Sequence, residues 1–181
     1  MKIFLDCSDA ELVRTYYETG LVDGVTTNPS LMLKAGKNPK DVYKEISDIF
    51  PFHASISAEV VGETAEDMLD MAEDLIDIGP NITIKVPCTP QGLKACKELS
   101  EDEVNVNVTL IFSAAHGAKT QVLAASIRES YQVAQAFKVG ADICTIPSKV
   151  FEKMFTHVLT DKGLEIFDKD WKKLQSELGT T

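Results

Sequence analysis

Short apolar runs rich in β-branched residues alternate along the chain with longer segments of helical period. Each run is brief and apolar on both faces, as in the buried strands of a parallel sheet. We expect strands over residues 3–6, 24–27, 55–60, 82–87, 105–111, 121–126 and 141–147. Strict alternation of strand and helix requires parallel strands with helical crossovers, so the chain is predicted to be an α/β protein.

Two amphipathic segments illustrate the expected crossovers. Residues 9–19 follow Ser8 and Asp9, which are suitable helix caps. Residues 63–78 carry apolar side chains at helical spacing, with acidic residues on the opposite face. We expect the apolar stripes to pack on the sheet and the acidic face to be solvated.

Polar side chains at the strand ends favour a barrel over an open, doubly wound sheet. No Gly-rich phosphate loop follows any expected strand, which weakens the nucleotide-binding open sheet. In a barrel the active residues come from the C-terminal ends of several strands. The polar residues at these ends are Asp6, Thr26, Thr27, Asn28, Glu59, Lys85, Asn107, Thr109, Ser126 and Arg128.

One connection is too short for a regular βα unit. Only nine residues, 112–120, separate Ile111 from Gln121, whereas a parallel crossover normally needs a dozen or more. The total of 181 residues is also below the length typical of eight βα units. We therefore predict a (β/α)8 TIM barrel that lacks about one βα unit, the sixth strand and its helix, between residues 112 and 120.

Composition narrows the choice of partner and compartment. The net charge of −10 argues against nucleic acid or an anionic membrane as the main partner. No apolar stretch is long enough for a membrane span, and the N-terminus has no signal-peptide layout. The four cysteines are scattered, so we expect neither a disulfide framework nor a metal site. A cytoplasmic protein is expected.

Lys85 is the candidate nucleophile. It lies among β-branched residues in an expected central strand, where desolvation favours the neutral, nucleophilic amine. A gatekeeper lysine on an edge strand is the alternative. Asp6 and Glu59 end two other strands and are candidates for proton transfer, although a helix cap and a surface ion pair explain them equally simply.

Two further segments allow a structural and a functional interpretation. The segment from Thr26 to Ser30 has the composition of a turn followed by a helix start. Ser126 and Arg128 fit either a helix entry with a surface arginine or a phosphate clamp at a helix N-terminus. The chain has only one other arginine, Arg14.

In combination, several motifs resemble the small transaldolase and fructose-6-phosphate aldolase family, whose members are class I aldolases with a (β/α)8 barrel. The resemblance covers nearly the whole chain. Its motifs are Phe4-Leu5-Asp6-Cys7-Ser8, Gly24-Val-Thr-Thr-Asn-Pro-Ser30, Ser57-Ala-Glu-Val60, Ile84-Lys-Val-Pro87, Asn107-Val-Thr-Leu-Ile-Phe-Ser113 and Leu123-Ala-Ala-Ser-Ile-Arg128.

The resemblance implies a role for each matching position. Lys85 matches the lysine that forms the Schiff base, and Asp6 matches the residue that takes the proton of the substrate C4 hydroxyl. Glu59 and Thr109 match the pair that handles protons with a water. The remaining matches are substrate contacts: Thr27, Asn28, Asn107, and the phosphate contacts Ser126 and Arg128.

Glu59 points to the transaldolase branch, because aldolase members have glutamine there. The implied function is transfer of a dihydroxyacetone unit between sugar phosphates, within the pentose phosphate pathway and without a cofactor. A Ser-Pro-Phe-Val-Gly-Arg type motif, which supplies a second phosphate-binding arginine in relatives, is absent from the sequence. A fructose-6-phosphate aldolase or a weakly active sugar-phosphate-binding paralogue therefore remains an alternative.

The resemblance also implies an assembly. Residues 1–181 are expected to form one barrel domain, with a C-terminal helix over about 160–178. In the family this helix packs on a neighbouring subunit. A homo-oligomer is implied, with rings of five or a decamer.

Overall fold

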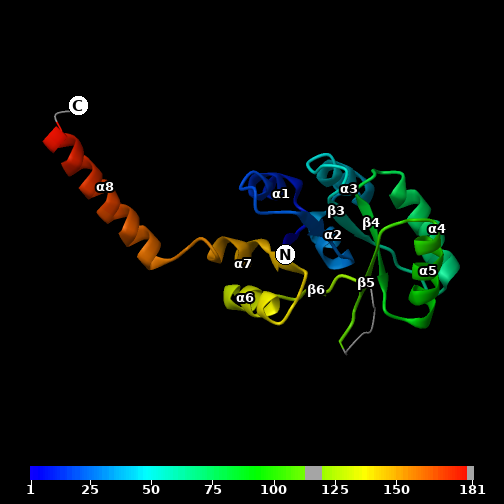
Figure 1. Ribbon diagram of the computed structural model, residues 1–181. Helices are drawn as coiled ribbons and strands as arrows, with labels where there is room; N and C mark the ends of the chain where they lie inside the picture. Colours follow the sequence, from blue (N-terminus) through cyan, green and yellow to red (C-terminus); the bar gives the residue numbers. More distant parts are fainter. Residues whose placement is uncertain (113–119, 179–181) are drawn as a thin grey trace.

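A computed structural model describes residues 1–112 and 120–178. Within these residues seven strands form one sheet, and every neighbouring pair is parallel (Figure 1). The strands are β1 (Lys2–Asp6), β2 (Gly24–Thr26), β3 (Ser55–Glu59), β4 (Ile82–Pro87), β5 (Val106–Thr109), β6 (Leu123–Ala124) and β7 (Ile143–Pro147). All seven expected strands are present, several with shorter bounds.

Helices follow every strand except β5 in the described residues, as parallel crossovers require. They are α1 (Ala10–Tyr17), α2 (Pro29–Ala35), α3 (Pro39–Ser47), α4 (Ala65–Ile76), α5 (Pro90–Glu101), α6 (Ser130–Lys138), α7 (Ser148–Lys153) and α8 (Val158–Leu178). Asp9 caps α1 by accepting hydrogen bonds from the backbone of Glu11 and Leu12. The two amphipathic segments expected to be helices correspond to α1 and α4.

The strand order shows a barrel that is not closed. It runs β5-β4-β3-β2-β1-β7-β6, so β1 pairs with both β2 and β7, as the first strand of a closed barrel pairs with the second and the last. Among the described residues, β5 and β6 are the two edges. The prediction that a βα unit is lacking between these strands is confirmed. The expected course of the connection itself lies largely outside the described residues.

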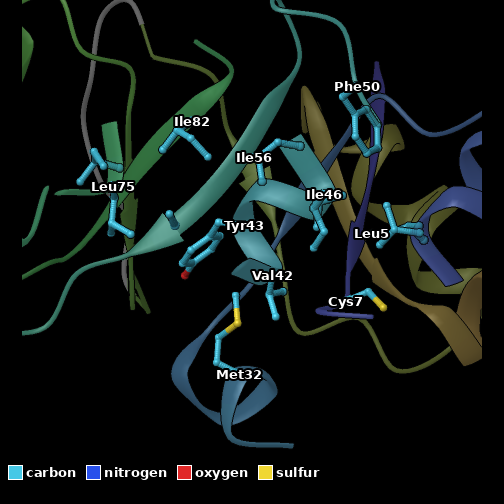
Figure 2. Close-up of a cluster of buried hydrophobic side chains, with 14 of the residues drawn as sticks. Leu5, Cys7, Met32, Val42, Tyr43, Ile46, Phe50, Ile56, Leu75 and Ile82 are labelled. Carbon is cyan, nitrogen blue, oxygen red and sulfur yellow. The ribbon is translucent and has the colours of Figure 1, made fainter. Parts of the chain in front are cut away.

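The outer face of the sheet packs against the helices. Buried side chains of alternate strand residues form the core with apolar helix residues (Figure 2). The strand members include Leu5, Val25, Ile56, Ile84 and Ile146, and the helix members include Val13, Ile46, Met68, Ala95 and Phe151. This layer explains why the strand runs are so apolar.

The inner face is polar in the layer below the strand ends. Thr26 Oγ1 lies 2.7 Å from Thr145 Oγ1, linking β2 to β7 across β1, and Ser55 Oγ lies 2.7 Å from Thr83 Oγ1. Thr26, Ser57 and Thr145 are buried. Hydroxyls that are hydrogen-bonded to one another can be buried at little cost, and they support the charged groups at the strand ends.

Helix α8 extends away from the rest of the chain (Figure 1). It covers the helix expected over about 160–178, and it carries exposed Leu164, Phe167 and Trp171 at spacings of three and four residues. Within the described residues, no helix is both long and apolar enough to cross a membrane.

Candidate active site

Lys85 and Glu59 form an ion pair at the C-terminal ends of β4 and β3. Parallel register places the two residues side by side, and Lys85 Nζ lies 2.8 Å from Glu59 Oε2. The two side chains are only 11% and 13% exposed. Lys85 Nζ also donates a hydrogen bond of 2.9 Å to the carbonyl oxygen of Thr27. Lys85 is therefore a buried residue of a central strand, not an edge gatekeeper.

Two acceptor atoms lie beside the Lys85 amine, a carboxylate oxygen of Glu59 and the carbonyl oxygen of Thr27. To act as a nucleophile, a lysine must release a proton, and the Glu59 carboxylate is the acceptor already in contact with Nζ. An amine beside a carboxylate can lose its proton to it and then attack a carbonyl group.

Asp6 is the second carboxyl group of the site. It ends β1, and its Oδ1 accepts a hydrogen bond of 2.9 Å from Thr26 Oγ1. Burial raises the pKa of Asp6, while the Thr26 hydrogen bond and the positive charge of Lys85 oppose that rise. A carboxyl group with a raised pKa is a stronger base than an exposed aspartate, which is useful in proton abstraction.

The turn after β2 contributes Thr27 and Asn28. Thr27 is fully buried, and its hydroxyl donates to the Ser57 carbonyl at 3.0 Å, so its carbonyl oxygen is the atom that faces Lys85. Asn28 Oδ1 accepts from the backbone N–H of Leu31 at 3.0 Å and so caps α2. Its side-chain amide group can still donate to a ligand. The turn-and-cap interpretation of this segment is therefore confirmed, and its role as a substrate contact stays a prediction.

On β5, Asn107 and Thr109 lie beside β4. Asn107 pairs with Lys85 in the register, and Thr109 pairs with Pro87. Asn107 Nδ2 donates to Ser57 Oγ at 3.1 Å, across the inner face of the sheet. Both residues are half-buried, because β5 is an edge strand in the described structure.

Ser126 and Arg128 lie apart from this network. They follow β6, at the other edge of the sheet, and both are exposed. Ser126 adopts a left-handed backbone conformation with a φ of 58°. Among the described residues, neither side chain forms a hydrogen bond or an ion pair with Asp6, Glu59 or Lys85.

The structure adds three polar residues that the sequence argument did not select for the site. Ser57 and Thr145 lie with Thr26 in the layer beneath the charged groups, and Tyr43 of α3 reaches Thr27 from the outer side. Alternation along β3 could have identified Ser57, because it lies two residues before Glu59. Nothing in the local sequence around Tyr43 indicates its long-range contact.

No metal site accompanies these residues. In residues 1–112 and 120–178, no group of three or more His, Cys, Asp or Glu side chains is placed to hold a metal ion.

Comparison with known proteins identifies the family of this chain. The family model described as transaldolase/fructose-6-phosphate aldolase matches residues 3–119 and 114–178. The two matching segments meet where the chain lacks a βα unit. Among solved structures, orotidine 5'-phosphate decarboxylase from Pyrococcus horikoshii OT3 aligns over 81% of this chain and 89% of its own, with 13% identity and a TM-score of 0.49.

Curated relatives are much more similar in sequence. A probable transaldolase of Paracoccus denitrificans is 43% identical, and the alignment covers 96% of this chain and 97% of that protein. A probable transaldolase of Nitrosopumilus maritimus is 40% identical over 98% of this chain and 97% of that protein. The first alignment spans 213 residues, more than the 181 of this chain, so the relative contains internal residues that this chain lacks. The chain belongs to the transaldolase/fructose-6-phosphate aldolase family.

Proposed function

We propose that this protein is a transaldolase that transfers a dihydroxyacetone unit between sugar phosphates through a Schiff base on Lys85. The observation that carries the proposal is the buried Lys85–Glu59 pair at the strand ends, with Nζ and Oε2 2.8 Å apart. An amine beside a proton acceptor, with a second carboxyl group on β1, has the groups that imine chemistry needs.

The first half of the reaction forms the imine. Glu59 takes a proton from the Lys85 ammonium, and the free amine adds to the C2 carbonyl of the ketose. The resulting carbinolamine loses its hydroxyl as water, with Glu59 and Thr109 supplying and removing protons through a bound water. The product is a protonated imine, which attracts electrons from the adjacent carbon.

The second half breaks and remakes a carbon–carbon bond. Asp6 removes the proton of the C4 hydroxyl, the C3–C4 bond breaks, and its electron pair moves to the imine to give an enamine. The aldehyde fragment leaves. The enamine then attacks an acceptor aldehyde, Asp6 returns the proton, and hydrolysis frees Lys85. Asn28 and Asn107 hold the substrate hydroxyls during these steps.

Sugar phosphates are the proposed substrates, with Ser126 and Arg128 as contacts for the phosphate group. A guanidinium group and a hydroxyl near a helix start fit a phosphate dianion. We place the reaction in the pentose phosphate pathway. Glutamate rather than glutamine at position 59 favours transfer over simple cleavage, so a fructose-6-phosphate aldolase is the less favoured alternative.

A second candidate function follows from the open side of the barrel. With β5 and β6 as edges, one wall of the site is absent from the described structure, and the second phosphate-binding arginine implied by the family is not in the sequence. A paralogue that binds sugar phosphates but turns them over weakly would have this arrangement.

We also propose that the protein is a homo-oligomer, because helix α8 exposes apolar side chains. Its exposed stripe of Leu164, Phe167, Trp171 and Leu174 has the spacing of a helix face that packs against another chain. A ring of five or a decamer is the assembly that we propose. We assign the protein to the cytoplasm, where the four free cysteines would remain reduced.

A trapping experiment tests the mechanism. The protein is incubated with fructose 6-phosphate, reduced with borohydride, and mapped by peptide mass spectrometry, with an adduct expected on Lys85. A coupled assay with and without erythrose 4-phosphate then distinguishes the functions. Turnover only with the acceptor supports transfer, turnover without it supports the aldolase, and an adduct with negligible turnover supports the paralogue. An adduct on another lysine would refute the role of Lys85.

A further inference from the structure

Tyr43 is a buried tyrosine on the outer side of the sheet. It belongs to α3, is 3% exposed, and lies in the apolar core with Val42, Ile46 and Ile56 (Figure 2). The core that surrounds it is otherwise built from apolar side chains, in which phenylalanine would pack equally well. A hydroxyl group in this position costs free energy unless it is hydrogen-bonded, so its partners matter.

The Tyr43 hydroxyl is bonded to the back of the active site. It lies 3.1 Å from Thr27 Oγ1, and Thr27 Oγ1 in turn lies 3.0 Å from the Ser57 carbonyl oxygen. A carbonyl oxygen can only accept, so Thr27 donates to Ser57 and accepts from Tyr43. The chain of donors therefore runs from α3, through the turn after β2, to β3.

Tyr43 remains a donor over the working pH range of most proteins. Burial raises the pKa of its phenol, and the hydrogen bond with Thr27 and a contact with the backbone of Glu59 act against that rise. The phenol is thus neutral near pH 7. Its hydroxyl contacts Thr27, and the carbonyl oxygen of Thr27 accepts a hydrogen bond from Lys85 Nζ.

We infer that Tyr43 is a positioning residue for Lys85, which acts by fixing the turn that presents the Thr27 carbonyl oxygen to Nζ. Thr27 is already bonded to β3, because its backbone N–H and its hydroxyl both donate to the Ser57 carbonyl oxygen. Tyr43 adds a third hydrogen bond to this turn, from the outer side of the sheet. The inference rests on the proposed Schiff-base function of Lys85.

The effect of Tyr43 must pass through Thr27, because the Tyr43 hydroxyl cannot reach a substrate. At 3% exposure the side chain has no path to the inner face. A positioning role therefore predicts a change in the rate of imine formation without a change in substrate affinity. A purely structural role predicts lower stability with unchanged kinetics in the folded protein.

Tyr43→Phe is the direct test, because it removes only the hydroxyl. With saturating fructose 6-phosphate, we expect the rate constant for borohydride-trapped adduct at Lys85 to fall about threefold to tenfold, the loss expected for one neutral hydrogen bond. KM should change by less than about twofold.

Ser47→Ala is the matched control. Ser47 lies on the same helix, is also buried, and its hydroxyl donates to Asn81 Oδ1 at 2.6 Å, away from Lys85. Both variants lose one buried hydrogen bond from α3. Ser47→Ala should lower the unfolding midpoint but leave the trapping rate of the folded protein unchanged. Equal trapping rates in Tyr43→Phe and wild type would overturn the inference.

A double-mutant cycle identifies the route of the effect. Thr27→Val removes the hydroxyl that accepts from Tyr43, so the double variant should trap substrate no more slowly than Thr27→Val alone. Fully additive losses would contradict coupling through Thr27. If wild-type protein itself gives no adduct on Lys85, the proposed function fails before the Tyr43 variants are compared, and the two failures are therefore distinguishable.

Discussion

The candidate site residues near the middle of the sheet differ from those near its two edges in the number of neighbouring strands. Asp6, Glu59 and Lys85 end strands that have a hydrogen-bonded neighbour on both sides, and all three are held by contacts with adjacent strands. Asn107, Thr109, Ser126 and Arg128 belong to or follow the two edge strands and are half-buried or exposed. A group between two neighbouring strands is more desolvated and has more partners than a group at an edge, where only Asn107 of the four forms a side-chain hydrogen bond to the inner face of the sheet among the described residues.

This difference separates the expected chemistry into two parts. In the proposed mechanism, Lys85, Glu59 and Asp6 lie on the closed side, from β7 to β4, where the sheet is continuous. Thr109 and the proposed phosphate contacts Ser126 and Arg128 lie on the open side, where the sheet ends. The loss of one βα unit should therefore weaken substrate binding more than it weakens the reactivity of Lys85.

Lys85→Met should have the largest effect of any substitution. It removes the nucleophile but keeps a side chain of similar length, and we expect turnover to fall by more than about a thousandfold. Borohydride should trap no adduct. Lys97→Met is the control, because Lys97 is exposed on α5 and only 3.7 Å from Glu101 in a surface ion pair. Comparable activity in wild type and Lys85→Met would show that Lys85 is not the nucleophile.

Asp6→Asn should slow the carbon–carbon bond step while sparing imine formation. The amide cannot take the C4 hydroxyl proton, so turnover should fall about a hundredfold or more, as is typical for losing an acid–base group. Single-turnover trapping at Lys85 should remain within a few-fold of wild type. Equal losses in trapping and turnover would mean that Asp6 acts on Lys85 itself instead of on the substrate.

The sequence was sufficient to predict the parts of the fold that depend on local pattern. All seven strands and the position of the lacking unit were predicted, because parallel buried strands leave apolar runs and a crossover has a minimum length. The bounds of short strands were less well predicted. β6 has two residues where 121–126 were expected, since a strand at an edge has only one neighbour to fix its length.

Candidate site residues that belong to a local sequence motif could be predicted from the sequence. Residues that join the site only through contacts between distant segments could not. Strand-end position was enough to select Asp6, Glu59 and Lys85. It could not show that the Thr27 hydroxyl points away from the site and that its carbonyl accepts from Lys85. Tyr43 was not selected at all, because its partner lies 16 residues earlier and depends on how α3 packs.

Arg128→Gln tests the open side. If Arg128 binds the phosphate group, KM for fructose 6-phosphate should rise about tenfold to a hundredfold, the loss expected for one charge-assisted hydrogen bond. KM for dihydroxyacetone, which has no phosphate group, should hardly change. Arg14→Gln is the control, because Arg14 is the other arginine of the chain and is exposed on α1, not at a strand end. An equal rise for both donors would show that Arg128 does not recognise the phosphate group.

Glu59→Gln should lower turnover and should also change its outcome. Glutamine can still hydrogen-bond Lys85, but it cannot accept a proton from it. We expect the ratio of transfer to cleavage to fall several-fold, measured with fructose 6-phosphate in the presence and absence of erythrose 4-phosphate. An unchanged ratio would show that residue 59 does not determine the choice between the two reactions.

The smallest expected effect is on the free energy of unfolding. The test compares a carboxyl group of the candidate site, Asp6, with one on the surface, Asp67. Burial raises the pKa of Asp6 above the ordinary 3.8, whereas hydrogen bonds from Thr64 lower the pKa of Asp67 in the capping box of α4. The protonated form of Asp6 is therefore favoured by folding, and the ionised form of Asp67 is favoured.

The two aspartates should therefore affect the pH dependence of stability with opposite signs. The stability that Asp6 contributes is complete below its unfolded pKa and is lost as the pH rises through its folded pKa. Asp6→Asn should therefore unfold at a higher urea concentration than wild type between about pH 4 and about pH 7. For Asp67 the contribution is present above the unfolded pKa and lost as the pH falls through the folded pKa, so Asp67→Asn should be destabilised near pH 7 and approach wild type near about pH 3. Parallel pH profiles for the two variants would contradict the assignment of Asp6 as a desolvated base, because a site carboxyl group without that penalty would behave like the surface one.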